Sequence, residues 1–484
     1  MKILLIQPPN MNMLTTNVPA FVDQETGFYP PLGLFYLAAY LQKNSSHTIS
    51  VLDAVVERVD YQILEQYIAQ YDPDVVGIQM MSFTVRDTLL TARAVKRAKK
   101  QAQVVVGGPH PNIYAEETIA QPDIDMIVLG EGEHIFTELI QYLEKGMDLH
   151  ELPGIVFKNK GQPVRNPGAG FIADLDSLPF PARELTPYRK YYSVLSKRAV
   201  FTTMISSRGC PYRCLFCDRA FYGKIHRMRS AENVVSEMER CQKMGIEEID
   251  FQDDIFTFSR KRVFEICDRI QSKKLNLSWN IRSRVDTIDK EMLKRMSEAG
   301  CQRIYYGIES GTPELQKVLR KNIDLEKAIQ VFRWTRDCNI STLAYFMIGS
   351  PSETKRDIYR TIEYMNRLHP DFVHISITTP FPGTDLYSLG LKNGLFEKDY
   401  WQEYARNPFH DFTPRYWNEL LTRQELLDLL RIAYKKFYLR PQYIICELMK
   451  IRSLKELMKK IKMGIRMILF SVSTWLRPSA KAGS

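Results

Sequence analysis

The chain has 484 residues, of which 45% are hydrophobic and 25% are charged, and it contains eight cysteines. This composition excludes an intrinsically disordered chain, a collagen-like fibre and a small secreted disulfide scaffold, and it favours a reducing, cytoplasmic location. The net charge of +10 is concentrated in residues 447–484, which carry nine Lys or Arg and two Glu. The rest of the chain is close to neutral, so we expect no nucleic-acid partner.

The first 145 residues alternate short aliphatic segments with amphipathic ones. The aliphatic segments are nearly free of charge, as expected of strands that are buried on both faces of a parallel sheet. We expect strands at residues 3–7, 48–52, 75–80, 103–106 and 126–129, and helices at 32–41, 61–71 and 85–101. This alternation predicts an α/β fold in which residues 1–145 form a doubly wound, Rossmann-like parallel sheet of the flavodoxin type.

Small and polar residues follow three of these strands, at the sheet edge where doubly wound folds bind ligands. Glycines allow a backbone to approach a flat ligand closely, although each loop taken alone is also typical of an ordinary strand-to-helix turn. The triplet at 130–132 has only part of a dinucleotide-binding fingerprint, because the third glycine is missing. We predict a ligand site made by Ser82, Phe83, Thr84, Gly107, Gly108, His110, Gly130, Glu131 and Gly132.

Residues 146–195 are rich in proline and turn residues, which predicts a semi-rigid linker. Strand–helix alternation resumes over residues 196–395, and we expect six strands, at 201–205, 248–252, 277–281, 303–308, 343–348 and 372–377. Six such units predict a partial (β/α)6 barrel whose chemistry lies at its C-terminal mouth. Residues 396–484 are expected to form a helical C-terminal region.

Two segments of this C-terminal region each have two interpretations. Residues 451–476 place an apolar stripe between lysines, which is typical of a helix on an anionic membrane surface and equally of a helix docked on the barrel. The tyrosine-rich residues 400–416 could line a substrate cavity or pack a domain junction, and packing is the commoner role of such aromatics.

The strongest chemical signal is the segment Cys210-Pro211-Tyr212-Arg213-Cys214-Leu215-Phe216-Cys217. Three thiols within eight residues can converge on one metal centre, and no fourth cysteine lies nearby. A structural zinc ion normally takes four protein ligands, whereas an iron–sulfur cluster held by three thiolates leaves one iron open for another ligand. The spacing therefore favours Cys210, Cys214 and Cys217 as ligands of an iron–sulfur cluster over a zinc site.

The cysteine spacing, with an aromatic residue before the last cysteine, resembles the radical S-adenosylmethionine superfamily. The first domain resembles the cobalamin-binding domain of that superfamily's B12-dependent branch, which contains methyltransferases and oxidative cyclases. The segments that carry this likeness are 29–33, 104–110, 130–133, 227–230, 284–286, 307–311 and 380–384. The resemblance implies a 4Fe–4S cluster, S-adenosylmethionine and cobalamin, with the predicted ligand site of residues 1–145 holding cobalamin. The Asp-x-His-x-x-Gly motif that places a histidine beneath cobalt is missing, so His110 is not assigned that role.

Residues that end the barrel strands are candidates for binding S-adenosylmethionine. One of Asp253 and Asp254 could accept a hydrogen bond from the methionyl ammonium, although an N-cap for the next turn is nearly as good an explanation. Arg284 could pair with a carboxylate, and Glu309 and Ser310 could bind ribose hydroxyls or the amino group. The predicted set, with the aromatic residue of the cysteine motif, is Phe216, Asp253, Asp254, Arg284, Glu309 and Ser310.

The resemblance implies an enzyme in which a 5′-deoxyadenosyl radical abstracts hydrogen from an unactivated carbon and methylcobalamin then supplies a methyl group. We expect a small hydrophobic substrate that is lipid-like or tetrapyrrole-like, and an external electron donor such as flavodoxin or ferredoxin. The alternatives are an oxidative cyclase or ring-rearranging enzyme without methyl transfer and a corrinoid-binding sensor, which would leave the three thiols unexplained. A tRNA methylthiotransferase would need N-terminal cysteines, and none precedes Cys210.

Overall fold

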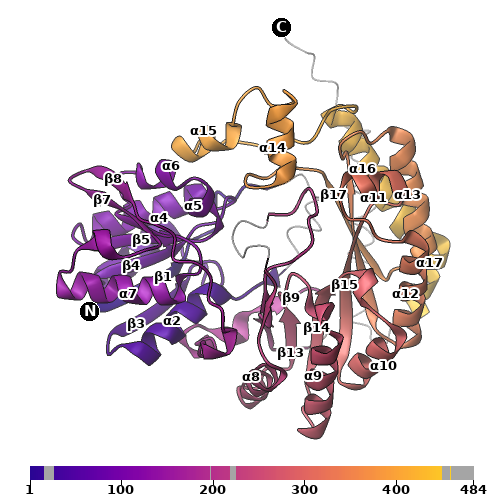
Figure 1. Cartoon of the computed structure of the whole chain (residues 1–484), viewed down its shortest axis with the longest axis horizontal. Helices are drawn as coiled ribbons and strands as arrows, with labels where there is room; N and C mark the ends of the chain where they lie inside the picture. The colour runs from indigo at the N-terminus through magenta and orange to yellow at the C-terminus, as the bar shows by residue number, and fades with distance from the viewer. Residues whose placement is uncertain (16–26, 197, 219–224, 450–457, 459–484) are drawn as a thin grey trace.

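The computed structural model describes residues 1–15, 27–196, 198–218, 225–449 and 458. The predicted amphipathic tail at 451–476 therefore lies, except for residue 458, outside the described residues. The N-terminal sheet domain and the barrel lie side by side, and helices from the C-terminal third of the chain span the gap between them (Figure 1).

The N-terminal sheet has the strand order expected of a flavodoxin-type fold. Its first five strands in space are parallel, and two antiparallel strands extend one edge. In spatial order the strands are β3 (Thr48–Asp53), β1 (Lys2–Gln7), β4 (Val75–Gln79), β5 (Gln103–Gly107), β6 (Met126–Val128), β7 (Ile155–Asn159) and β8 (Gln162–Arg165). The strand order reverses between β1 and β4, and the crevice outside their carboxyl ends is where such folds bind ligands.

The hairpin of β7 and β8 corrects part of the sequence analysis, which predicted a linker there. Lys160 and Gly161 form its two-residue turn, both with positive φ, as hairpin turns of this length require. Pro163 is tolerated because β8 is an edge strand. The proline-rich segment thus begins inside the first sheet, and residues 155–165 belong to that sheet.

Helices cover both faces of this sheet. Helices α2 and α7 pack together on one face, and α3 and α4 pack together on the other. The helices of the domain are α2 (Leu32–Asn44), α3 (Tyr61–Tyr71), α4 (Val85–Ala98), α5 (Pro109–Ile113), α6 (Ala115–Ile119) and α7 (Gly132–Lys145).

The second sheet has six parallel strands in sequence order, as expected of the partial barrel. These are β10 (Phe201–Met204), β13 (Glu248–Phe251), β14 (Ser278–Ser283), β15 (Cys301–Glu309), β16 (Ser341–Ile348) and β17 (Phe372–Ile377). Its helices are α8 (Ala231–Lys243), α9 (Arg260–Ser272), α10 (Lys290–Glu298), α11 (Pro313–Val318), α12 (Leu325–Asp337) and α13 (Lys355–Leu368).

The open edge at β17 is closed by α16 (Arg423–Tyr438). The hydroxyl of Tyr434 bonds both backbone groups of Ile375, at 3.0 and 3.1 Å, and Tyr438 bonds those of Val373, both at 3.0 Å. Two tyrosines one helical turn apart thus satisfy the backbone of an edge strand that would otherwise be free to pair. Helix α17 (Pro441–Met449) follows.

Helices α14 (Asp385–Lys392) and α15 (Tyr400–Arg406) connect the barrel to the first domain. Tyr400, Trp401 and Tyr404 are buried in the same apolar cluster as strand residues of the N-terminal sheet. The packing interpretation of the tyrosine-rich segment therefore holds for these three side chains. Two short antiparallel pairs complete the fold, β2 (Gly27–Phe28) with β9 (Tyr192–Ser193) and β11 (Ser207–Arg208) with β12 (Arg227–Met228).

Candidate active site

The three cysteines lie on the loop that follows the first barrel strand. β10 ends at Met204, β11 follows, and Gly209 with φ +84° turns the chain into the loop. Leu215 N donates to Leu319 O, and Leu386 N donates to Leu215 O, each at 2.9 Å. Two other segments of the barrel thus fix the middle of the loop, which lies at the C-terminal mouth.

The thiols of Cys210, Cys214 and Cys217 are free, and they are close enough to influence one another electrostatically. Burial raises the pKa of the Cys210 thiol, and Asp254 and Cys214 add to the effect. Iron binding therefore has to displace protons, since the thiolate is the ligand. Among the described residues, no three His, Cys, Asp or Glu side chains are already arranged as a metal site. The fit to a cluster comes from the donor set, three thiols on one loop.

A guanidinium and an ion pair stand beside these thiols. Arg284 Nη1 is 3.8 Å from the Cys214 sulfur, and Arg284 Nη2 donates to Lys321 O at 2.9 Å. Lys321 Nζ forms an ion pair with Glu309 at 3.1 Å and lies 6.0 Å from the ring centre of Phe216. Three predicted residues, Phe216, Arg284 and Glu309, thus gather around Lys321. Lys321 was not predicted from the sequence, because it follows α11 and not the end of a strand.

The adjacent carboxylates Asp253 and Asp254 have different surroundings. Asp253 is fully buried and accepts hydrogen bonds from Ser206 N and Ser207 Oγ, both at 2.6 Å, so it shapes the turn before the cysteine loop. Asp254 is exposed and lies close enough to Cys210 to raise its pKa. Ser310 is buried within hydrogen-bonding distance of Thr361. Of these, Asp254 is the residue whose carboxylate is close enough to the thiols to raise the pKa values of Cys210 and Cys217.

The predicted second site lies at the carboxyl edge of the first sheet, where three loops are tied together. Ser82 Oγ is 3.3 Å from His110 Nδ1, which joins the loops after β4 and β5. Asn112 donates to Gly108 O and accepts from Gly130 N, both at 2.7 Å, which joins the loops after β5 and β6. The structure therefore brings the predicted residues of all three loops together.

Two features of this edge fit a flat, polar-rimmed corrinoid. Gly108 has φ +124°, and a Cβ there would lie 2.6 Å from Met80 O, so the two loops touch through backbone. His110 is fully buried, and its Nε2 has no hydrogen-bond partner among the described residues. Burial lowers the pKa of His110 to about 3, so the imidazole is neutral. The glycine lets the two loops pack closely, and the unpartnered ring nitrogen is a group that a bound cofactor could satisfy.

Glu131 is used differently from the prediction. Its carboxylate accepts hydrogen bonds from Arg208, Arg227 and the backbone N of Ile172, so both oxygens are occupied. This placement does not support the predicted cobalamin-binding role of Glu131. The sequence did not predict these arginine partners, because β11 and β12 are each two residues long and leave no detectable periodicity.

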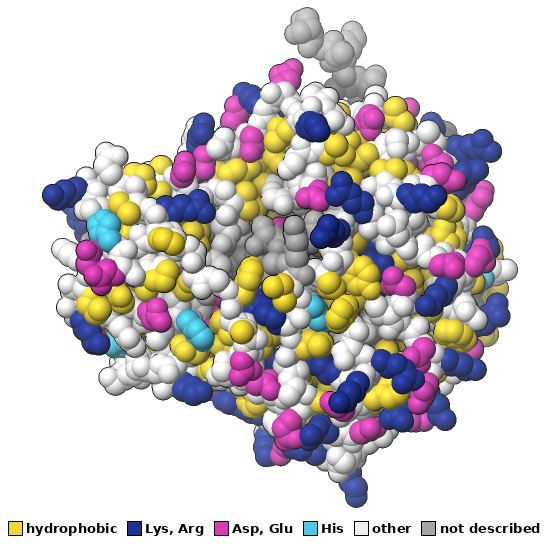
Figure 2. Space-filling model, in the orientation of Figure 1, with side chains coloured by type: hydrophobic (Ala, Val, Ile, Leu, Met, Phe, Trp, Pro, Cys, Tyr) yellow, Lys and Arg dark blue, Asp and Glu magenta, His cyan; other side chains and the backbone are white. Residues whose placement is uncertain are grey.

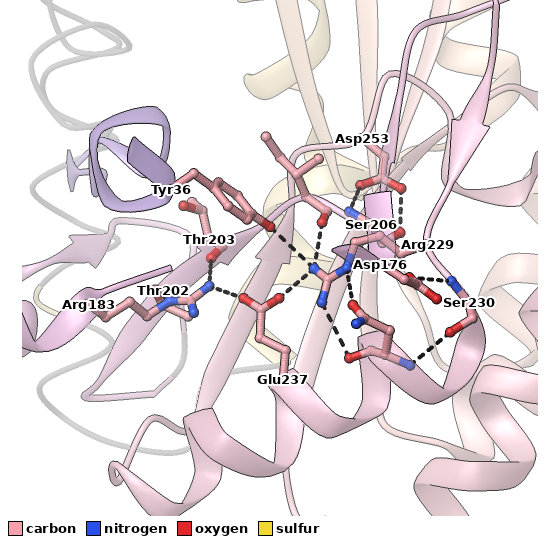
Figure 3. A network of polar contacts seen from close by, with 12 residues as sticks. Tyr36, Asp176, Arg183, Thr202, Thr203, Ser206, Arg229, Ser230, Glu237 and Asp253 are labelled. Carbon is pink, nitrogen blue, oxygen red and sulfur yellow. Dashed lines mark hydrogen bonds and ion pairs between the residues drawn. The ribbon is translucent and has the colours of Figure 1, made fainter. Parts of the chain in front are cut away.

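A buried polar network anchors the segment after β12 (Figure 3). Glu237 on α8 receives hydrogen bonds from Arg183 and Arg229, and all three side chains are at most 4% exposed. Arg229 also donates to the hydroxyl of Tyr36 on α2, at 3.3 Å. This network connects the barrel, the proline-rich segment and the first domain.

The carboxyl edges of the two sheets meet. The ring of Phe83, after β4, packs edge-on against that of Phe381, after β17, with centroids 5.2 Å apart. A Cβ on Gly383 would lie 3.0 Å from Ile113 on α5 and 3.5 Å from Asp218, the residue after Cys217. The loop after β17 therefore touches both the predicted cobalamin edge and the cysteine loop.

The barrel interior beneath the mouth is polar. Strand alternation directs Asp250, Arg282, Tyr305, Tyr345 and His374 inward, away from the helices. Arg282 pairs with Asp250 at 3.2 Å and lies over the Tyr305 ring, which stacks on Tyr345. His374 lies against Tyr345, and burial lowers its pKa, so its imidazole is neutral. The sheet assembles this array from five strands, one side chain from each.

Comparisons with known proteins agree with this geometry. Family models of the "Radical SAM superfamily" and the "B12 binding domain" match residues 204–365 and 20–140. An "uncharacterized methyltransferase" of Pyrococcus horikoshii is 34% identical over 448 residues, which cover 92% of this chain and 94% of the relative. The chain belongs to the cobalamin-binding radical S-adenosylmethionine enzymes. The resemblance predicted from the cysteine motif and the three loops is confirmed.

Two further relatives of this radical S-adenosylmethionine enzyme extend the comparison. The anaerobic magnesium-protoporphyrin IX monomethyl ester cyclase of Cereibacter sphaeroides is 27% identical over 424 residues, covering 86% of this chain and 68% of the cyclase. The solved structure of the methyltransferase TsrM from Kitasatospora setae has the same fold, with a TM-score of 0.67 and 22% identity over 81% of this chain and 76% of TsrM.

Family membership establishes the cofactors as a 4Fe–4S cluster, S-adenosylmethionine and cobalamin. Cys210, Cys214 and Cys217 would hold the cluster, and the loops after β4, β5 and β6 would hold cobalamin. No helix among the described residues is long and apolar enough to cross a membrane.

Proposed function

We propose that this enzyme methylates an unactivated carbon of a small hydrophobic biosynthetic intermediate. The observation that carries the proposal is the contact between the two carboxyl edges, in which the loop at Phe381 and Gly383 touches Phe83, Ile113 and Asp218. A substrate bound there could be reached from both cofactor sites without leaving the enzyme. The 34% identity to a methyltransferase over nearly its whole length supports the same reaction class.

The bound cofactors would supply radical hydrogen abstraction and a transferable methyl group. The chain's own task is to hold three thiolates, to keep Asp254 and Arg284 beside them, and to exclude water from the junction. Arg284 Nη1 lies 3.8 Å from the Cys214 sulfur and so places a positive charge beside the proposed cluster ligands. Asp254 remains our candidate for the methionyl ammonium, because it is exposed and electrostatically close to the thiols, whereas the carboxylate of Asp253 is buried and bonded by Ser206 and Ser207.

A hydrophobic substrate is supported by the rings at the junction. Phe83, Phe216 and Phe381 are half-buried, so part of each ring is available to a ligand. Below the mouth, Arg282, Tyr345 and His374 offer hydrogen-bonding groups. We therefore propose a substrate with an apolar body and at least one polar group, which a functionalised lipid or a tetrapyrrole would satisfy. Electrons would come from an external donor such as flavodoxin or ferredoxin. A peripheral membrane contact is not part of the proposal, since the tail lies outside the described residues.

The test uses reconstituted holoenzyme under anoxic conditions with a reductant, an extract of lipids and tetrapyrroles, and S-adenosylmethionine labelled on its methyl group. We expect a product that carries the label, together with S-adenosylhomocysteine and 5′-deoxyadenosine. Cys214→Ala should lose iron and all 5′-deoxyadenosine. Cys301→Ala, which changes a buried core cysteine, should keep both.

Oxidative cyclisation is the second candidate, and the 27% identity to a cyclase favours it. The same incubation separates the two reactions. A product that is formed with 5′-deoxyadenosine but without label, and with no S-adenosylhomocysteine, would establish the cyclase and overturn the methyltransferase. A protein that binds corrinoid but makes no 5′-deoxyadenosine under any condition would be a sensor.

A further inference from the structure

The cysteine loop is closed at its base by the two-residue ladder of β11 and β12. Ser207 pairs with Met228 and Arg208 pairs with Arg227, so the two arginines lie directly opposite each other. The chain leaves this base at residue 209 and returns to it at residue 226. Whatever holds the two arginines therefore sets where the loop begins and ends.

The arginines are held by the first domain. Arg208 Nη1 donates to Glu131 Oε1 at 2.8 Å, and Arg227 Nη1 donates to Glu131 Oε2 at 2.6 Å. Arg227 Nη2 reaches Oε1 as well, at 3.1 Å, and Arg208 Nη2 donates to Glu133. Glu131 Oε2 also accepts from the backbone N of Ile172, at 2.7 Å. Two carboxylates thus face two guanidiniums in a charge-balanced group.

This group is buried, which makes its geometry selective. The side chain of Glu131 is 1% exposed, and those of Arg208 and Arg227 are 5% and 9% exposed. A buried ion pair gains little net stability over apolar packing, because both charges must be desolvated. It is favourable only in one good geometry, and planar forks on a carboxylate define both distance and direction. Such a contact is suited to orienting two domains.

Glu131 also stands next to the other cofactor site. It lies between Gly130, whose backbone N is bonded by Asn112, and Gly132, the first residue of α7. Asn112 in turn bonds Gly108 O at the cobalamin edge. Hydrogen bonds from that edge thus reach Gly130, and its chain neighbour Glu131 bonds the base of the cysteine loop. Arg229, two residues after Arg227, adds a second contact to the first domain through Tyr36 (Figure 3).

We propose that Glu131 is a positioning residue that fixes the cysteine loop relative to the cobalamin-binding edge. It acts through Arg208 and Arg227 and touches neither cofactor. The proposal goes beyond the methyltransferase assignment, because a cyclase with the same two cofactors would need the same alignment.

The test measures the distance between the two cofactors in the holoenzyme. Cob(II)alamin and the reduced 4Fe–4S cluster are both paramagnetic, so pulsed electron paramagnetic resonance reports the distribution of distances between them without any substrate. For Glu131→Gln we expect this distribution to broaden about twofold. Iron and corrinoid contents should stay at wild-type levels. Glu117→Gln is the matched control, since Glu117 also bridges the domains, through Gln402 and Arg406 on α15, far along the chain from the cysteine loop.

A Glu131→Gln enzyme with both cofactors and the wild-type distribution would overturn the proposal. Loss of corrinoid with iron retained would also overturn it, because Glu131 would then be a cobalamin-binding residue. If Glu131→Gln fails to fold, the same distance measurement is made on Arg227→Lys. Lysine keeps the charge but removes the two-pronged contact, so the distribution should still broaden. A wild-type distribution in folded Arg227→Lys would likewise reject the proposal.

Discussion

Two contacts between the first domain and the rest of the chain differ in chemistry. At α15, Tyr400, Trp401 and Tyr404 are buried in one apolar cluster with the strands of the first sheet. At the β11–β12 ladder, Glu131 and Glu133 of the first domain form buried ion pairs with Arg208 and Arg227. Both join the same two parts of the molecule, but apolar packing is non-directional whereas ion pairs are directional.

The two kinds of contact have different effects. Apolar packing holds the two parts of the molecule together, whereas ion pairs fix their relative orientation. Burying a large aromatic side chain stabilises in almost any well-packed arrangement, so the α15 contact supplies adhesion. The ionic contacts gain little net free energy and lose what they gain when geometry changes. They lie next to the cysteine loop, where alignment matters, and the apolar contact lies farther along the chain. The outer surface shows no comparable segregation, since charges of both signs are interspersed over the visible face (Figure 2).

The largest effect is expected for Trp401→Ala at the apolar contact. Trp401 is fully buried against Phe381 and Phe412, so truncation should lower the free energy of unfolding by about 3–5 kcal/mol. Chemical denaturation measures the change. Phe409→Ala, at a ring that is 50% exposed, should cost less than about 1 kcal/mol. Equal losses for the two variants would mean that α15 does not supply the adhesion.

Glu237→Gln should cost about 3 kcal/mol, because it leaves the buried guanidiniums of Arg183 and Arg229 without their counter-charge. Chemical denaturation of Glu237→Gln and of Glu184→Gln measures the two losses of stability for comparison. Glu184 pairs with Arg240 at the surface, both about half exposed, and should contribute under about 1 kcal/mol. A loss of similar size in both variants would contradict the importance of burial.

The same ion pairs predict a pH dependence. Burial alone would raise the pKa values of Glu131 and Glu237, but the neighbouring arginines outweigh it and hold both below the ordinary 4.5. A lowered folded-state pKa stabilises the fold above the unfolded value and is lost as pH falls through the folded one. The stability difference between wild type and Glu237→Gln should therefore be constant near neutrality and shrink below pH 4.5. Thermal unfolding of both proteins across pH measures this difference. A difference that grows on acidification would contradict the prediction.

Gly108→Ala tests the cobalamin edge and should cost about 1–3 kcal/mol in local strain. Its φ of +124° disfavours a side chain, and the new Cβ would meet Met80 O at 2.6 Å. We expect less bound corrinoid per chain with iron unchanged, measured by absorbance and metal analysis. Gly33→Ala, with no heavy atom within 4 Å of the added carbon, should retain corrinoid fully.

The smallest effect, about 1 kcal/mol, is expected for Glu117→Gln at the rim of the apolar contact. Arg406, its partner, is 62% exposed, and the amide can still accept from Gln402. Denaturation should give a midpoint close to wild type. A loss as large as that of Trp401→Ala would show that charge, too, holds this contact together.

Much of both sheets could be predicted from sequence because each strand is a local apolar run. The strand at 372–377 agrees residue for residue, and the others agree within two residues. The cysteine loop was equally local, since its three thiols fall within eight residues. The hairpin of β7 and β8 was missed because prolines nearby suggested a linker.

The features that the sequence did not predict are contacts between residues far apart in the chain. Glu131 and Arg227 are separated by 96 positions, and nothing in either neighbourhood indicates the other. Lys321 reaches Glu309 only because the chain turns back after α11. Pairing of buried charges is decided by the assembled fold, so the arginines that bond Glu131 could not be inferred from the residues around it.

The shared apolar core has a consequence for the order in which the protein is made. Tyr114 on the first domain bonds Asp399, 285 residues later, and α15 follows directly. At a synthesis rate of 5–20 residues per second, roughly 15–60 s separate the emergence of the two from the ribosome. Throughout that interval the nascent first domain exposes the apolar surface that α15 will cover. The domain that binds cobalamin is thus completed only after the whole barrel has been translated, so it matures last although it is synthesised first.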